Sequence, residues 1–180
     1  MDSTDLLADL RTLLPSVTLE PVAAPDQQTI GIPSNSIVEV CRVLRDARGF
    51  MLLADITAVD WWPREPRFEV VYHLASADRR LRLKTRLAGS GARLPTVKPL
   101  WPAANWLERE VWDLFGIVFE GHNDLRRLLM PEDWEGYPLR KDFPVQIRMK
   151  PRASEPLQVS EEEFRRNLQA DKVARTREGR

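Results

Sequence analysis

The side chains best suited to acid–base chemistry lie in two acidic clusters, at residues 108–110 and 132–133. Both clusters are mixed with arginine and aromatic residues, a composition typical of protein–protein interfaces. A free-standing enzyme would use Glu110 or His122 as its general base. The alternative is that Glu110 lies at the water-exposed border of a helix and that His122 is structural. We favour an interface over an active site at these positions.

Residue counts and spacing exclude several other kinds of site. Cys41 is the only cysteine, so the chain has no internal disulfide and lacks the roughly four thiolates that an iron–sulfur cluster needs. His73 and His122 are the only histidines, which argues against a histidine-rich zinc site. The stretch 89–91 reads Gly-Ser-Gly, but Leu94 stands where a dinucleotide-binding fingerprint needs a third glycine.

The composition is that of an ordinary folded chain of 180 residues, 43% hydrophobic and 30% charged, which predicts one domain with an appendage. The 27 basic and 27 acidic residues cancel, which argues against a general nucleic-acid binder, because such proteins carry a basic excess. The acidic start lacks the features of a secretory signal, and no apolar run reaches the ~18 residues that span a bilayer. We therefore expect a protein inside the cell that reaches a membrane only through a partner.

Two helices are predicted in the first fifty residues. Leucines on one face of a 3.6-residue period predict a helix at residues 4–14. A short strand at 17–20 and a proline-rich loop at 21–33 follow. A second amphipathic helix starts at Ser34, and Gly49 is its expected stop.

The middle of the chain predicts strands. The nearly continuous apolar run at residues 50–56 suits a central strand that is buried on both faces. Residues 68–74 and 80–87 predict a hairpin closed by the turn at 76–78, and the second of these strands alternates apolar and basic residues. The basic face could suggest RNA binding, but a solvated face is the commoner reason for such a pattern. No aromatic residue alternates with the basic ones to stack on bases.

A third helix is predicted at residues 102–115, ended by Gly116. Glu110 lies within its apolar stripe, so its carboxylate must be ion-paired, protonated or at the border of the stripe. The stripe consists of Ala103, Trp106, Leu107, Val111 and Leu114.

After a short strand at residues 117–119 the character of the chain changes. Residues 120–152 show neither helix nor strand periodicity, and their prolines and glycines forbid a long helix. The segment still carries many large apolar residues, and each of its aromatic side chains can bury roughly 150–250 Å². So long a loop points to a function, and we predict an extended arm laid across another surface. Its apolar anchors are Leu128, Leu129, Met130, Trp134, Tyr137, Leu139 and Phe143.

Together these elements predict an α+β fold: a small, mostly antiparallel or mixed β-sheet packed with helices, followed by an extended C-terminal arm. We assign residues 1–118 to the α+β domain, 119–150 to the partner-binding arm and 151–180 to a charged tail. A capping box at residues 160–163 predicts a short helix in that tail.

The chain resembles a known protein family in three ordered stretches. Residues 106–117 read W-L-E-R-E-V-W-D-L-F-G-I and resemble the signature W-x-E-R-E-x-x-D-L-F-G-I of the C subunit of NADH-quinone oxidoreductase, respiratory complex I. The similarity continues through F-E-G-H-N-D-L-R-R at residues 119–127 and E-G-Y-P-L-R-K-D-F-P at 135–144. Two positions depart from the family, because Asn123 stands where proline is usual and Tyr137 where histidine is common.

The resemblance implies a structural, non-catalytic subunit in the peripheral arm of a proton-pumping NADH:quinone oxidoreductase. Its C-terminal arm would wrap on the neighbouring D subunit, which forms much of the quinone site, with the B and I subunits nearby. The implied place is the cytoplasmic side of the inner membrane, held there through the complex only. FMN, iron–sulfur clusters and quinone are expected on partner subunits and not on this chain. The signature does not separate this family from equivalent subunits of membrane-bound hydrogenases and other quinone or ferredoxin oxidoreductases.

We therefore predict no catalytic, cofactor-binding or metal-binding residue on this chain, and a set of partner-binding residues within the signature. Glu110 is expected to pair with Arg126 or Arg127, and Trp134 and Phe143 are expected to be binding hot spots. The full set is Glu108, Arg109, Glu110, Asp113, Asp124, Arg126, Arg127, Trp134, Tyr137, Leu139, Arg140, Lys141, Asp142 and Phe143.

Overall fold

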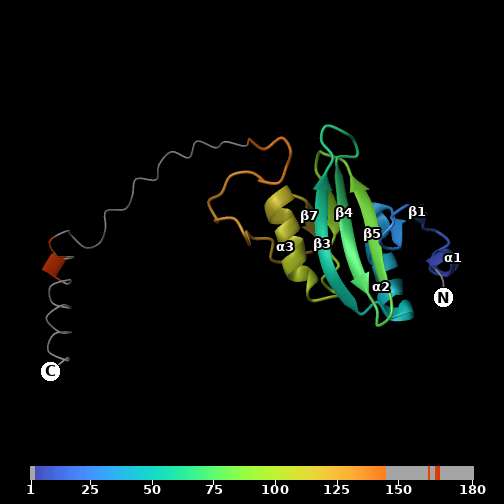
Figure 1. Ribbon diagram of the computed structural model, residues 1–180. Coiled ribbons are helices and arrows are strands. Elements are labelled where there is room, and N and C mark those ends of the chain that lie inside the picture. The colour runs from blue at the N-terminus through green and yellow to red at the C-terminus, as the bar shows by residue number, and fades with distance from the viewer. Residues whose placement is uncertain (1–2, 145–161, 163–164, 167–180) are drawn as a thin grey trace, which may run out of the picture. The chain divides into compact units, whose positions relative to one another are not determined.

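A five-stranded mixed sheet is the centre of the fold in the computed structural model, which describes residues 3–144, 162 and 165–166 (Figure 1). Its strand order is β1-β2-β5-β4-β3, with β2 and β5 parallel and the other neighbours antiparallel. The strands are β1 (Glu20–Val22), β2 (Thr29–Gly31), β3 (Leu52–Asp60), β4 (Phe68–Ala75) and β5 (Arg80–Leu87). A two-stranded parallel sheet pairs β6 (Arg93–Pro95) with β7 (Val118–Glu120). The α+β class predicted from the sequence is confirmed.

The helices are α1 (Ser3–Leu13), α2 (Ile37–Arg48), which follows the short 3-10 helix η1 (Ser34–Ser36), and α3 (Ala104–Phe115). In Figure 1, α2 lies behind the sheet and α3 lies beside β3. Gly49 ends α2 as predicted: it adopts a left-handed φ of 72° and donates its N–H to the Leu44 carbonyl. The apolar stripe of α2 is confirmed, because its buried residues are Ile37, Val40, Cys41 and Leu44. Within the described ranges, no helix has the length and apolar character needed to cross a bilayer.

Strands β4 and β5 form the hairpin that the alternation predicted. They pair in register from Phe68 opposite Leu87 to Ala75 opposite Arg80, and the Ser76 N–H closes the turn on the Arg79 carbonyl at 2.9 Å. Every second residue of β5 is buried, while the basic residues between them lie toward solvent. The main sheet therefore packs one face on the core and carries charged side chains on the other.

Strand β3 is an edge strand, so the prediction of a central strand buried on both faces is wrong. Its burial alternates from Leu53 to Asp60 apart from a register shift at Ala54 and Asp55, as in a strand with one solvated face. The prediction failed because the apolar run at residues 50–56 begins before the strand. Phe50 is fully buried at the junction with α2, whereas the next residue, Met51, is 70% exposed. The nearly continuous apolar composition of residues 50–56 hid the alternation.

Three short strands differ from the sequence-based expectation. The proline-rich stretch at residues 21–33 is predicted to be loop, but it contains most of β1 and all of β2. Strand β6 is not predicted at all. Three-residue strands are too short to show a period of two, and their pairing depends on neighbours that lie far away in the sequence.

The chain divides into two compact units after Phe143, whereas a boundary after residue 118 is predicted from the sequence. The first compact unit is Met1–Phe143 and contains both sheets. Residues 121–143 come back along α3, and we call them the return segment. The last residues of the predicted arm, 145–150, lie outside the described residues, as does the tail apart from 162 and 165–166.

Candidate functional site

Helix α3 carries charged side chains on its buried face. Glu108, Arg109 and Asp113 are buried, whereas Trp106 is 56% exposed. The predicted apolar stripe is therefore wrong at Trp106 and also at Ala103, which precedes the helix and is exposed. The partners of these buried charges lie in the β6–α3 connection and in the return segment. The helical periodicity of a sequence cannot predict contacts with residues so far away in the chain.

The Asp113 carboxylate organises the first turn of the return segment. Its Oδ2 accepts N–H groups from Leu128, Leu129 and Met130 at 2.9, 2.7 and 2.9 Å, and its Oδ1 pairs with Arg127 at 2.9 Å. The carboxylate is fully buried. Although burial opposes ionisation, these donors hold the pKa of Asp113 below its ordinary value. One side chain thus fixes three consecutive peptide groups of the return segment.

The Arg127 guanidinium joins that turn to the next one. Its Nη2 donates to the carbonyls of Trp134 and Gly136 at 2.8 and 2.9 Å. The guanidinium also lies over the rings of Trp112 and Tyr137, 5.5 and 5.4 Å from their centroids. Arg127 therefore ties residues 134–137 to the end of α3.

The predicted partner of Glu110 is wrong. Arg127 pairs with Asp113, and Arg126 pairs with Asp124 at 2.9 Å. Glu110 itself is half-buried on α3. Residues 110 and 113 are one turn apart, and the return segment approaches the helix on the side of Asp113.

Arg109 is a second anchor for the same turn. It is almost fully buried, and its Nε and Nη2 donate to the main-chain carbonyls of Arg126 and Arg127 at 3.2 and 3.0 Å. Its guanidinium stacks 5.0 Å from the ring of Trp106 and lies 3.9 Å from Asp124. Arg109 thereby links the exposed indole of α3 to the return segment.

The far end of the return segment is fastened to the β3–β4 connection. Arg67 makes two bonds to Asp60, at 2.9 and 2.7 Å, and two to Asp142, at 3.0 and 2.7 Å. The Lys141 N–H donates to Asp60 Oδ2 at 2.8 Å. Burial works against ionisation of Asp60, but Arg67 and the N–H donors keep its pKa at about 2.

Gly116 lets the return segment approach the end of α3. Its φ is 73°, and a Cβ there would collide with the side chains of Tyr137 and Arg140. Gly49 has nearly the same φ, 72°, but a Cβ there would meet nothing within 4 Å. We expect Gly49→Ala to cost about 1 kcal/mol for conformation alone and Gly116→Ala roughly twice that or more. Urea unfolding of both variants measures the difference, and equal losses would contradict a packed contact at Gly116.

Glu108 is fully buried without an ion pair in the described part of the chain. It accepts the Thr96 hydroxyl at 2.5 Å and the Val97 N–H at 2.7 Å. Burial raises the pKa of Glu108 to about 7, although these two donors act in the opposite direction. Glu108 and Asp113 have no exposed side-chain surface here, so they contribute to a binding surface by positioning its exposed residues.

The predicted partner-binding residues divide by exposure. Those with exposed side chains are Arg126, Leu139, Lys141 and Asp142. Those that are half-buried are Glu110, Asp124, Arg127, Trp134, Tyr137, Arg140 and Phe143. The rings of Trp134 and Phe143 stack with centroids 6.3 Å apart. Leu129, one of the predicted apolar anchors, is 60% exposed, and the surface also carries Trp106, which was predicted to face inward.

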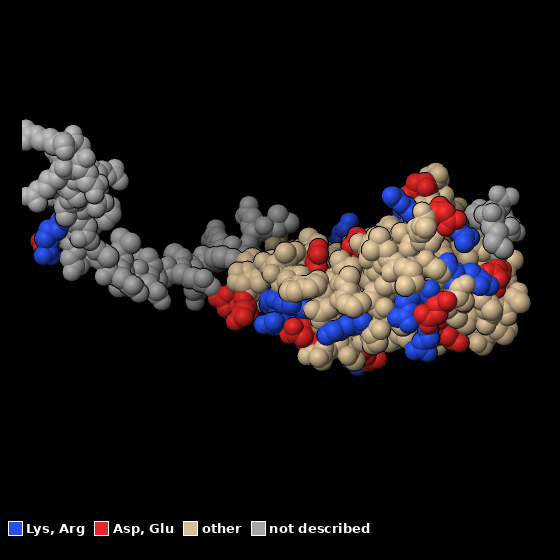
Figure 2. Space-filling view, turned by 90° about the horizontal axis from the view of Figure 1, so that it is seen from below, with Lys and Arg blue, Asp and Glu red and all other residues tan. Residues whose placement is uncertain are grey.

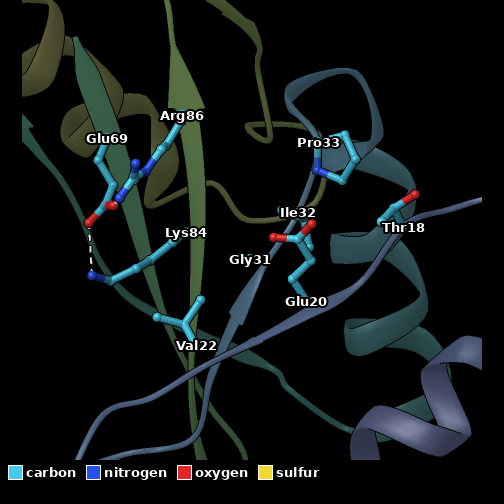
Figure 3. A pocket seen from close by; sticks show the side chains of 9 residues that line it. All are labelled: Thr18, Glu20, Val22, Gly31, Ile32, Pro33, Glu69, Lys84 and Arg86. Atoms are coloured by element: carbon cyan, nitrogen blue, oxygen red, sulfur yellow. Dashed lines mark hydrogen bonds and ion pairs between the residues drawn. The ribbon is translucent and has the colours of Figure 1, made fainter. Parts of the chain in front are cut away.

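A groove of about 550 Å³ lies elsewhere, over β1, β2 and β5 on the charged face of the main sheet (Figure 3). Gly31 and Glu20 line it from β2 and β1, and Glu69, Lys84 and Arg86 line it from β4 and β5. Glu69 pairs with Lys84 at 2.8 Å and with Arg86 at 3.3 Å, so these opposite charges satisfy one another. Among the residues that the structure describes, no three His, Cys, Asp or Glu side chains are grouped to hold a metal ion.

The surface charges are interspersed rather than separated. In the view of Figure 2, basic and acidic side chains lie next to one another over the described residues. Ion pairs such as Arg82 with Asp26 at 2.7 Å contribute to this pattern.

Comparison with protein-family models decides the family. Residues 30–148 match the model described as the 30 kDa subunit of respiratory-chain NADH dehydrogenase. The chain belongs to this family. The matched range includes α3 and the whole return segment, so the buried charges and the exposed apolar residues described above are features of a family member.

Curated relatives are named as C subunits of NADH-quinone oxidoreductase. The relative from Geobacter metallireducens is 50% identical over 121 residues, which cover 66% of this chain and 75% of the relative. The relative from Roseiflexus sp. is 44% identical over 149 residues, 81% of this chain and 86% of the relative. The resemblance found in the sequence is therefore confirmed.

Two solved structures share the fold. A trypsin-resistant fragment of Nqo5 matches with a TM-score of 0.58 and 36% identity over 69% of this chain and 100% of the fragment. A chain of a membrane-bound sulfane sulfur reductase, an archaeal respiratory membrane complex, matches with a TM-score of 0.67 and 33% identity. That match covers 79% of this chain and 85% of the other.

Proposed function

We propose that the chain is the C subunit of a proton-pumping NADH:quinone oxidoreductase. In this proposal it binds the large quinone-site D subunit, lies near the B and I subunits, and has no active site of its own. FMN, the iron–sulfur clusters and the quinone belong to the partner subunits. The assembly holds the chain at the cytoplasmic side of the inner membrane.

The observation that carries the proposal is that the return segment has a fixed main chain and exposed apolar side chains. Its main chain is fixed by Arg109, Asp113 and Arg127, yet Leu129 and Leu139 are 60% and 51% exposed. Apolar side chains on a rigid surface bind a partner with little loss of conformational entropy. The segment also follows the family signature directly. Fixed geometry is what a subunit needs if it holds electron-carrying neighbours at constant distances.

The two stacked aromatic residues of the return segment give a direct prediction. We expect Trp134→Ala and Phe143→Ala each to weaken binding to the D subunit by about 2 kcal/mol or more, because large aromatic side chains that become desolvated at an interface dominate binding energy. Since the rings contact each other, the double variant should lose less than the sum of the two. Binding of purified variants to membranes that lack the chain measures both effects. Unchanged binding of both single variants would contradict the prediction.

An equivalent subunit of another respiratory complex is the second candidate. It is favoured by the 33% identity to a chain of the sulfane sulfur reductase complex. Membrane-bound hydrogenases and other quinone or ferredoxin oxidoreductases contain such subunits. Genes for NADH-binding flavoprotein subunits next to the gene for this chain would favour the first proposal, and hydrogenase-type genes would favour the second.

Purification of the tagged chain from native membranes tests the proposed function. We expect the D subunit together with B, I and an NADH-oxidising flavoprotein, and NADH:quinone activity in the purified assembly. Recovery of the chain alone, or with unrelated proteins, would overturn the proposal.

A further inference from the structure

We propose that the β3–β4 loop at residues 61–66 is a second docking element, which inserts tryptophan side chains into an apolar pocket of the same partner that covers the return segment. We call these residues the tryptophan loop. The inference rests on the proposed function and adds to it a surface outside the family signature.

The tryptophan loop exposes two of the largest apolar side chains in the protein. Trp61 is 40% exposed and Trp62 is 51% exposed, and Pro63 and Pro66 beside them are also exposed. Tryptophan is among the residue types most enriched at binding hot spots, because one indole buries a large area and loses few rotamers on binding. Val59, the neighbouring outward residue of β3, extends the apolar surface.

The loop is held rigidly although its indoles are exposed. The Trp62 N–H donates to Asp60 Oδ1 at 2.9 Å, and the Trp61 N–H donates to the Arg67 carbonyl at 2.8 Å. The Glu65 carboxylate accepts the Arg67 N–H at 3.1 Å and the Gly89 N–H at 3.0 Å. All of these bonds have main-chain donors, so hydrogen bonds that do not involve the indoles fix the backbone that displays them. Such preorganisation favours docking.

The tryptophan loop is continuous with the return segment. Arg67 at the base of the loop bonds Asp60 and Asp142 together, and Asp60 also accepts the Lys141 N–H. Leu139, which is exposed, lies two residues before this junction in the return segment. A partner that covers the end of the return segment reaches the tryptophans as well.

The charges around the loop indicate the chemistry of the occupant. Arg64 and Glu65 in the loop and Lys141 and Asp142 at its base are exposed, whereas the Asp60 carboxylate is buried against Arg67. The exposed charges nearest the indoles are thus two basic and two acidic side chains. We infer a protein pocket that is apolar in its centre and carries charged groups of both signs at its rim.

Rebinding of the purified full-length chain to membranes from a strain that lacks it tests this inference. The double variant Trp61→Ala/Trp62→Ala should bind at least roughly 30-fold more weakly than wild type. The matched control is Met51→Ala, which removes a 70% exposed side chain just before the other end of β3 and should bind like wild type. Urea midpoints of both variants should equal that of wild type, because the loop is held by main-chain bonds.

Each other outcome overturns the inference. If the return-segment variants Trp134→Ala and Phe143→Ala lose binding but the tryptophan-loop variant binds like Met51→Ala, the proposed function stands and the second docking element is wrong. If the wild-type chain itself does not bind, the proposed function and the second docking element are both wrong. Binding of wild type, but not of the loop variant, to vesicles of anionic phospholipid would assign the loop to a lipid surface instead. Self-association lost in the loop variant would assign it to a second copy of the chain.

Discussion

Replacing Asp113 by alanine is expected to lower the free energy of unfolding by about 3–5 kcal/mol, the range seen when one partner of a buried charge pair is removed. The variant would leave three main-chain N–H groups and the Arg127 guanidinium without their acceptor. The turn at residues 127–130 should then detach from α3. Urea unfolding measures the loss of stability, and trypsin cleavage after Arg126 and Arg127 should become faster.

Glu110→Gln is the matched control for Asp113→Ala. Glu110 lies one turn earlier on the same helix and is half-buried. Its replacement should change the free energy of unfolding by no more than about 0.5 kcal/mol, as is usual for surface substitutions. If Glu110→Gln proved as damaging as Asp113→Ala, the carboxylate that holds the return segment would have been misassigned.

The buried Glu108 should make stability depend on pH. Its pKa is raised from 4.5 in the unfolded chain to about 7 in the folded one, so the folded state binds more protons between these values. The stabilisation that Glu108 contributes is therefore fully present below about pH 4.5. It is lost as the pH rises through 7. The difference of about 2.5 pKa units corresponds to roughly 3 kcal/mol.

Comparison of wild type with Glu108→Gln isolates this contribution from other titrating groups. The glutamine is neutral at every pH, its carbonyl oxygen can accept the Val97 N–H in place of Oε1, and its NH2 group can donate to the Thr96 hydroxyl oxygen in place of Oε2. We expect the free energy of unfolding of wild type, relative to the variant, to decline between pH 5 and pH 8. Parallel pH profiles of the two proteins would show that Glu108 is ionised in the folded state like an ordinary carboxylate.

Much of the fold follows from local pattern in the sequence. The alternation of leucine and basic residues at 80–87 predicted the β4–β5 hairpin, and the stripe around Val40 predicted α2 with its stop at Gly49. These predictions succeeded because the pattern and the burial have the same cause, one face of the element against the core. The prediction for strand β3 was wrong because the apolar composition of its first half concealed the alternation of buried and exposed residues.

The candidate site was harder to predict because it breaks the rule that apolar residues face inward. Asp113 and Arg109 are buried and Trp106 is exposed, since the return segment brings main-chain donors and acceptors to the helix. The periodicity of the helix sequence gives no information about these main-chain groups. The signature around residue 110 located the right helix, but only the structure could choose Asp113 over Glu110 as the partner of Arg127.

Thiol labelling at Leu139 tests the central claim, that the return segment docks on a partner protein of the complex. Cys41 is the only native cysteine and is fully buried, so Leu139→Cys gives one reactive thiol at a side chain that is 51% exposed. We predict fast labelling of the free chain and labelling at least roughly tenfold slower in the membrane-bound complex, because hot-spot surfaces exclude water when bound. Full labelling in urea sets the end point for both samples. Equal rates in the free chain and in the intact complex would contradict the account.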